Sequence, residues 1–355
     1  MQVALVNFIF SFAVSALTIA CLLPVSRRLN WLDRPDERKQ HLNPTPPIGG
    51  FGVLLGIMIP VFWMSGLTQQ TLGFAVGGFF LVMVGALDDK FDLNWKIRIL
   101  AQTVAALSMI YISGVRAEHV GPLFGFGDIE LGWLSVPFSV FVTLGLINAL
   151  NMFDGIDGLV GAVCFAVVSM FVAASLYADS PSMAVSLFCV LGAIAGFLLF
   201  NMRFPWQSKA KVFLGDAGSG FIGFTLAYIT FSLTQPPMHP ISPILGPFML
   251  APPVIDCLVL IVHRIRKGKS PFTAGRDHGH YLMLDAGFTV NEIVRFMLML
   301  SCLFGLFAGL AMIFNVPAPL LVMAYMLAMF FWFWITGSDD RANRYFRWLH
   351  QKIYQ

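Results

Sequence analysis

Long runs of apolar residues alternate with short polar segments along the whole chain. A transmembrane α-helix needs about 20 predominantly apolar residues to cross roughly 30 Å of hydrocarbon. Runs of this kind cover residues 3–25, 48–66, 72–88, 97–113, 134–150, 157–177, 183–200, 218–234, 243–263, 291–314 and 317–336. The pattern therefore predicts an all-α fold, a polytopic membrane bundle of about eleven transmembrane helices. No linker interrupts it, so we expect one multi-pass transmembrane domain over residues 1–336.

Positively charged residues gather in alternate loops between these runs. The cationic loops lie at 27–39, 90–98, 203–211 and 264–276, and residues 337–355 form a basic tail. Since cytoplasmic loops carry an excess of Lys and Arg, these segments are predicted to be cytoplasmic. The C-terminus is then cytoplasmic and the N-terminus periplasmic. Arg27 and Arg28 follow the first run, the reverse of the charge order in a signal peptide, so we expect that run to remain as a helix.

The composition excludes a soluble globular domain, because 57% of the residues are hydrophobic and only 12% are charged. The net charge of +3 is accounted for by the topology and by anionic membrane lipids, so we expect no nucleic-acid partner. All five Cys residues fall within predicted helices, without paired spacing or neighbouring His residues. They are expected to pack rather than to bind metal.

Acidic residues are the informative minority in such a chain, since an ionised carboxylate near hydrocarbon is costly and usually serves a site. The third run ends in Asp88 and Asp89, with Asp92 one turn further on. A solvated helix end would explain any one of these acids, but the cluster favours a functional site. Asp256 lies deep in the ninth run and is expected to pair within the bundle or to line a water-filled cleft.

The fifth run ends in a stretch rich in side-chain oxygens. Asn148 and Asn151 share one helical face, and Asp154 and Asp157 follow with two Gly residues that permit a tight turn. An ordinary loop of Asp and Gly would explain Asp154 but not the two amides.

Before the eighth run, Lys211 and Phe213 precede Asp216, which lies between small residues. Asp216 is a candidate metal ligand, and the competing interpretation is a helix-capping Asp.

The longest predicted cytoplasmic loop concentrates cations beside two His residues, namely Arg276, His278 and His280. The first cytoplasmic loop adds Lys39 and His41, which could contact phosphate. Basic residues at a membrane usually reflect topology alone, so the His residues carry more weight. Together with the acids, these residues suit Mg²⁺, with Mn²⁺ as the alternative, plus a diphosphate; zinc would require more His or Cys.

In this order the motifs resemble the polyprenyl-phosphate N-acetylhexosamine-1-phosphate transferases. The blocks are "RKQHLNPTPPIGG", "DDKFD", "NALNMFDGIDGL", "VFLGDAGS" and a final loop with His, all between about residue 30 and about residue 290. The nearest branch in appearance is that of the bacterial undecaprenyl-phosphate N-acetylglucosamine-1-phosphate transferases, which start O-antigen or common-antigen synthesis. The final block of that branch usually reads His-x-His-His, whereas this chain ends the block with Tyr281. The phospho-N-acetylmuramoyl-pentapeptide transferases of peptidoglycan synthesis rank second.

The resemblance implies an enzyme of the bacterial inner membrane with a cytoplasmic active site. It would move a sugar 1-phosphate from a UDP-N-acetylhexosamine to undecaprenyl phosphate and release UMP. By this resemblance, Asp216 and Asn151 coordinate Mg²⁺, Phe213 stacks on uracil and Asp157 helps to hold the base. Arg276 and the two His residues contact diphosphate or sugar, and Asp88 and Asp89 face the lipid phosphate. The full set of candidates is Asp88, Asp89, Asp154, Asp157, His278 and His280 as catalytic residues, Asn148, Asn151, Phe213, Lys211, Arg276, His41 and Lys39 for substrate, and Asp216 with Asn151 for metal.

A hypothesis from a different class is a secondary transporter, since helical bundles with buried acids are often transporters. Transporters place their charges near the middle of the membrane, whereas here only Asp256 is predicted to lie deep. A homodimer is a further expectation. Direct attack by the lipid phosphate and a covalent aspartyl intermediate both remain open, as do the separate roles of Asp88 and Asp89.

Overall fold

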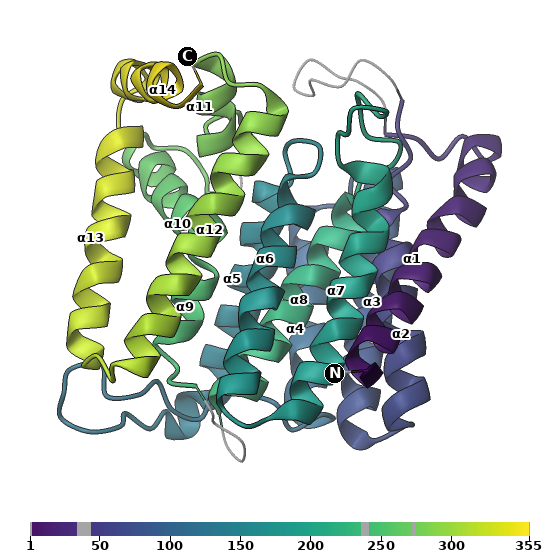
Figure 1. Cartoon of the computed structure of the whole chain (residues 1–355), viewed down its shortest axis with the longest axis horizontal. Helices are drawn as coiled ribbons and strands as arrows, with labels where there is room; N and C mark the ends of the chain where they lie inside the picture. Colours follow the sequence, from purple (N-terminus) through teal and green to yellow (C-terminus); the bar gives the residue numbers. More distant parts are fainter. Residues whose placement is uncertain (1, 34–43, 236–240, 272–274, 355) are drawn as a thin grey trace.

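The computed structural model describes residues 2–33, 44–235, 241–271 and 275–354, and every regular element in these ranges is helical (Figure 1). In chain order the helices are α1 (Gln2–Arg28), α2 (Gly49–Ser65), α3 (Gln69–Phe91), α4 (Trp95–Tyr111), η1 (Gly132–Leu134), α5 (Ser135–Phe153), α6 (Leu159–Tyr177), α7 (Pro181–Asn201), α8 (Gly215–Thr234), α9 (Leu245–Met249), α10 (Ala251–Arg266), α11 (Gly279–Asp285), α12 (Val290–Ile313), α13 (Ala318–Thr336) and α14 (Asp339–Tyr354). The prediction of an all-α bundle is confirmed.

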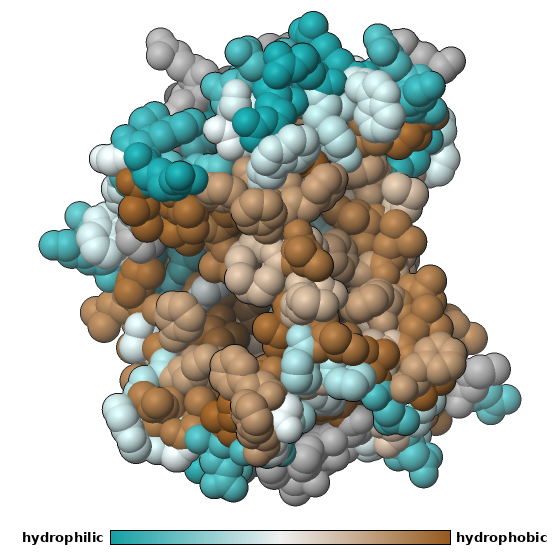
Figure 2. Space-filling view, turned by 90° about the vertical axis from the view of Figure 1, so that its left-hand side faces the viewer, coloured by the Kyte–Doolittle hydropathy of each residue, from teal (hydrophilic) through white to brown (hydrophobic). Residues whose placement is uncertain are grey.

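Within the described residues, eight helical segments are long and apolar enough to cross a membrane: α1, α3, η1 with α5, α6, α7, α8, α12 and α13. The shorter α2 is also apolar. Figure 2 views the side of the molecule that carries α13, and a broad hydrophobic band crosses it between hydrophilic ends. Large apolar side chains of α13 are exposed, among them Leu320, Leu327 and Phe330. The chain is therefore a multi-pass membrane protein.

Each predicted run contains a helix, but the ninth run is broken in two. A short α9 ends at Met249, and α10 begins at Ala251 with Pro252 and Pro253 in its first turn. Proline is tolerated there because the first N–H groups of a helix have no partner within the helix. The two prolines therefore start a new helix rather than continue the old one.

Helix α8 forms the core of the bundle. Its most apolar stretch is 89% buried, compared with 11% for α13. Helices α2, α3 and α5 pack around it, and the ring of Phe74 on α3 is stacked with Phe224 of α8 and tilted against Phe221. The N-terminus of α8, which carries Asp216, is consequently surrounded by the ends of neighbouring helices.

The connection between α7 and α8 lies at the upper end of the bundle in Figure 1, together with α11 and α14. The segment that we predicted as a basic tail folds into α14, which buries Ala342 and Phe346 and packs against α11 and α13. The ring of Phe346 lies 6.0 Å from that of Trp332 on α13. The sequence prediction missed both of these shorter helices.

Candidate active site

The end of α3 and the start of α8 are joined by one carboxylate. The Oδ1 atom of Asp89 accepts the backbone N–H of Asp216 at 2.9 Å, and its Oδ2 atom accepts that of Ala217 at 3.3 Å. Gly215 has a φ of 74° and lies so close that a β-carbon there would be 2.5 Å from Asp89 Oδ2. An acidic side chain at a helix N-terminus is favourable because it meets free N–H groups and the positive end of the helix dipole. The side chain of Asp89 thus holds the start of α8 in place. The side chain of Asp216 does not cap this helix.

A cation lies between the remaining two carboxylates. The Nη1 atom of Arg98 on α4 is 3.2 Å from Asp88 Oδ2 and 3.8 Å from Asp216 Oδ2. The other oxygen of Asp88 accepts the backbone N–H of Leu93 at 2.7 Å, so the tight turn between α3 and α4 is fixed by the same side chain. Sequence reasoning had assigned Arg98 only to topology. The structure places it inside the candidate site.

Helix α5 adds amide groups to this cluster. The side-chain amide of Asn151 donates to Asp216 Oδ1 and, at 3.1 Å, to Ser219 Oγ. Asn148 lies nearly one turn earlier and donates to Gln102 Oε1 at 2.7 Å. Asn151 therefore belongs to the carboxylate cluster, whereas Asn148 ties α5 to α4 beside it.

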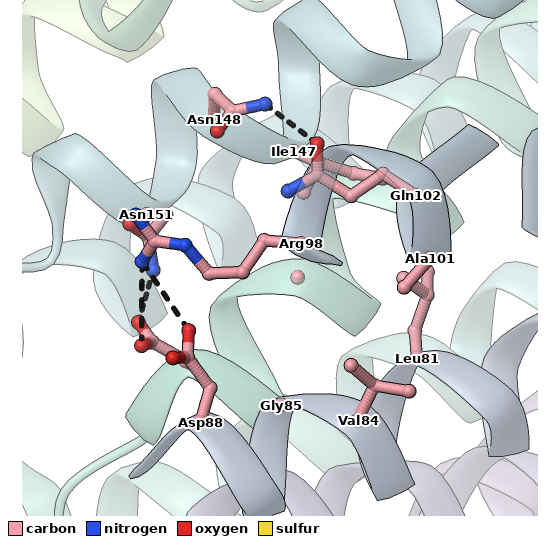
Figure 3. A pocket seen from close by; sticks show the side chains of 12 residues that line it. Leu81, Val84, Gly85, Asp88, Arg98, Ala101, Gln102, Ile147, Asn148 and Asn151 are labelled. Atoms are coloured by element: carbon pink, nitrogen blue, oxygen red, sulfur yellow. Dashed lines mark hydrogen bonds and ion pairs between the residues drawn. The ribbon is translucent and has the colours of Figure 1, made fainter. Parts of the chain in front are cut away.

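These groups line one end of a cavity of about 40 Å³ between α3, α4, α5 and α8. Figure 3 shows Asp88, Arg98 and Asn151 on one side of it, and Leu81, Val84 and Ala101 on the other. The cavity thus has a charged end and an apolar end.

The donor set at the charged end fits a magnesium ion better than a zinc ion. Among the described residues, no group of three or more His, Cys, Asp or Glu side chains is arranged to hold a metal. Mg²⁺ keeps several of its own waters and commonly takes only one or two carboxylates from a protein. Asp216 provides one carboxylate, a rotation of the Asn151 amide would present its oxygen beside it, and Asp88 leaves a second carboxylate next to this pair. Arg98 supplies the positive charge at this position in the present structure.

The two acids after α5 have different surroundings. Asp157 Oδ2 accepts Arg203 Nε at 2.7 Å and the backbone N–H of Ala210 at 3.2 Å, so it ties this loop to the one before α8. Burial raises the pKa of Asp154 to about 7, and the negative charges of Asp216 and Asp157 add to the effect. Asp154 therefore holds a proton more readily than an ordinary aspartic acid near neutral pH.

The segment that carries the two predicted His residues contacts the end of α5 and the loop that follows it. His280 is fully buried with its ring 5.8 Å from that of Phe153, and the hydroxyl of Tyr281 donates to the Gly155 carbonyl at 3.3 Å. Burial lowers the pKa of His280 to about 3, so this ring is neutral. The guanidinium of Arg276 lies 5.3 Å from the Tyr281 ring centre.

The other substrate candidates are less well connected to the cluster. Lys211 is exposed, and its backbone N–H donates to the Phe200 carbonyl at 2.8 Å. The backbone of Phe213 bonds to Pro46 and Gly49, so its loop is attached to the start of α2. Lys39 and His41 lie outside the described residues.

The fold and the site define a multi-pass membrane protein with an acidic, oxygen-rich cluster where α3, α4, α5 and the core helix α8 meet. A family model described as glycosyl transferase family 4 matches residues 71–234, which run from α3 to α8. The chain belongs to glycosyl transferase family 4, and the resemblance inferred from the motifs is confirmed.

Three curated relatives cover between 80% and 98% of the chain. The undecaprenyl-phosphate alpha-N-acetylglucosaminyl 1-phosphate transferase of Yersinia pestis is 35% identical over 288 residues, which are 80% of this chain and 77% of that protein. The protein of the same name from Escherichia coli (strain K12) is 33% identical and covers 98% of this chain and 95% of its own length. That of Haemophilus influenzae is 31% identical, with 98% and 97% covered.

Proposed function

We propose that this protein transfers N-acetylglucosamine 1-phosphate, or a related N-acetylhexosamine 1-phosphate, from a UDP-sugar to undecaprenyl phosphate and releases UMP. The names of the relatives support the acceptor and the type of group transferred. The observation that carries the proposal is the cluster of Asp88, Arg98, Asn151 and Asp216 around one cavity, because transfer between diphosphates needs both a metal-binding acid set and a cation. The product would be the first lipid-linked intermediate of an O-antigen or common-antigen type glycan.

The site would lie at the cytoplasmic face of the bacterial inner membrane. In this arrangement α1 to α8 cross eight times, α9 with α10 forms the ninth crossing, and α12 and α13 complete eleven. The N-terminus is then periplasmic, and α11 and α14 lie in the cytoplasm. The positive loops at the ends of these helices support this orientation. An undecaprenyl chain would stay in the bilayer while its phosphate reached the carboxylate cluster from the membrane side.

The reaction would exchange one diphosphate bond for another. An anionic oxygen of undecaprenyl phosphate attacks the phosphorus attached to the sugar, the bond from that phosphorus to the bridging oxygen breaks, and UMP leaves with the bridging oxygen. Asp88 orients the attacking phosphate, and Arg98 turns from the two carboxylates toward the negative charge that develops on the leaving group. Mg²⁺, when held by Asp216 and Asn151, would neutralise charge on the diphosphate.

The test is UMP release by membranes that contain this protein, with undecaprenyl phosphate and a panel of donors, with and without Mg²⁺ or Mn²⁺. The panel includes UDP-N-acetylglucosamine, UDP-N-acetylgalactosamine and UDP-N-acetylmuramoyl-pentapeptide. Metal-dependent release with a sugar donor, together with a lipid-linked sugar diphosphate, is the expected result. Turnover of the pentapeptide donor alone would move the protein to the peptidoglycan branch. No turnover with any donor would overturn the proposal and favour the secondary-transporter hypothesis.

Asp88 and Asp89 are expected to respond differently to the same substitution. Asp89→Asn removes one of two oxygens that bind N–H groups at the start of α8, so it lowers the melting temperature in detergent as well as turnover; loss of a helix cap costs about 0.5–2 kcal/mol. Asp88→Asn retains the oxygen that accepts the Leu93 N–H but loses the charge that faces Arg98. It should reduce UMP release and leave the melting temperature nearly unchanged. The opposite pattern would show that these two roles are assigned the wrong way round.

A further inference from the structure

Asp256 on α10 is a buried acid outside the carboxylate cluster, and only 5% of it is exposed. Its Oδ2 atom lies 3.0 Å from Nδ1 of His278. Its Oδ1 atom accepts the backbone N–H of Gly279 at 3.0 Å and the indole N–H of Trp332 at 3.1 Å. A buried carboxylate is costly unless its oxygens are hydrogen-bonded, and both oxygens are bonded here. This one side chain therefore joins α10, the start of α11 and α13.

The segment before α11 is attached to α10 at a second place. Arg264 is also buried, and it donates to both oxygens of Asp277 at 2.7 and 3.1 Å and to the Pro271 carbonyl at 2.8 Å. Asp277 and His278 are consecutive, so one dipeptide is bonded to two positions of the same helix that lie eight residues apart. The backbone of His278 is thus fixed independently of its ring.

The contact with Asp256 also fixes the ring of His278. An ionised carboxylate only accepts hydrogen bonds, so the hydrogen of a neutral imidazole must reside on Nδ1. Nε2 is then the nitrogen that remains for a substrate. The His278 ring is stacked on that of His280 with centres 5.4 Å apart, and His280 and Tyr281 contact the loop that follows α5. The network therefore reaches the loop next to Asn151.

We propose that Asp256 is a positioning residue that sets the orientation and the tautomer of His278, so that Nε2 of His278 faces the diphosphate of the bound UDP-sugar. Trp332 and the Gly279 N–H hold the carboxylate in place for this purpose. The inference rests on the proposed function, because it assigns His278 to that donor. This role also accounts for the presence of Asp256 within an apolar helix, so that no transport pathway is needed to explain it.

The experiment is a double-mutant cycle between Asp256 and His278 in full-length protein, with UMP release and melting temperature measured for each variant. Asp256→Asn keeps the volume, and its oxygen can still accept the Gly279 and Trp332 N–H groups. Its NH₂ group, however, would face Nδ1 of His278 and force the hydrogen onto Nε2. We expect kcat/KM for the UDP-sugar to fall about 10- to 100-fold, the range lost when a partner that orients a metal-ligating histidine is removed, with no comparable loss of melting temperature. In the His278→Ala background the same change should have little further effect.

Trp332→Phe is the matched variant, since it removes one of the three hydrogen bonds to the carboxylate and leaves Asp256 and His278 intact. Its loss of turnover should be smaller and should also vanish in the His278→Ala background. If Asp256→Asn fails to accumulate in the membrane, this second cycle provides the test. Additive effects in the cycle, or an Asp256→Asn variant with undiminished turnover, would overturn the inference alone. Absence of turnover in the unmodified protein would instead overturn the proposed function.

Discussion

Asp216→Asn is expected to reduce metal-dependent UMP release by about 10²–10³-fold or more, which is the loss seen when a group that stabilises transition-state charge is removed. The substitution changes one charge and almost no volume. The backbone N–H of residue 216 would still be held by Asp89, so the start of α8 should remain in place. The variant should therefore insert into the membrane and melt close to the temperature of the unmodified protein.

The control for this prediction is the same substitution at an acid far from the cluster. Asp128 is half-exposed in the connection between α4 and η1, where it lies 3.4 Å from His119. Asp128→Asn should keep full turnover. A titration with Mg²⁺ separates weakened metal binding, which excess metal would partly restore, from loss of the chemical step. Undiminished turnover in Asp216→Asn would remove Asp216 from the metal site.

The sequence was sufficient to predict the long apolar helices and to single out the acids near their ends, because runs of apolar residues and isolated carboxylates are both strong local signals in a membrane protein. It could not separate Asp88 from Asp89. That distinction depends on the approach of α3 to α8, and the partners of Asp89 are more than a hundred residues away. Arg98 was not identified as a site residue from the sequence for a different reason. The positive-inside rule already explains a cation at that position, so nothing in the sequence marked it as functional.

For two further features the sequence carried only part of the information. In α14, Ala342, Phe346 and Leu349 recur at helical spacing and face the protein, but the surrounding Arg residues led to the prediction of a basic tail. Asp256 was expected to pair within the bundle or to line a cleft. The structure gives it partners from the residue before α11, from the first residue of α11 and from α13, which no periodicity could have identified.

Gly85→Ala is expected to impair both turnover and stability, because α3 and α8 are in contact at this glycine. A β-carbon on Gly85 would lie 2.5 Å from both N and Cα of Ala217 and 2.8 Å from the carbonyl carbon of Asp216. These are backbone atoms, so no side-chain rotation relieves the clash, and α3 must move away by about 1 Å to restore van der Waals contact. The movement would stretch the bonds from Asp89 and displace Asp216.

A displacement of that size can cost about 10²-fold in rate, and overpacking costs about 1–3 kcal/mol of stability. The matched control is Gly145→Ala on α5, a helical glycine with no heavy atom within 4 Å of the added carbon. Gly145→Ala should retain turnover and melting temperature, which excludes a general effect of adding a methyl group to a membrane helix. If Gly85→Ala matched this control, the close approach of α3 to the N-terminus of α8 would not be needed to hold Asp216. The carboxylate cluster would then have to be positioned mainly by Asn151 and Arg98, the two side chains that reach it from α5 and α4.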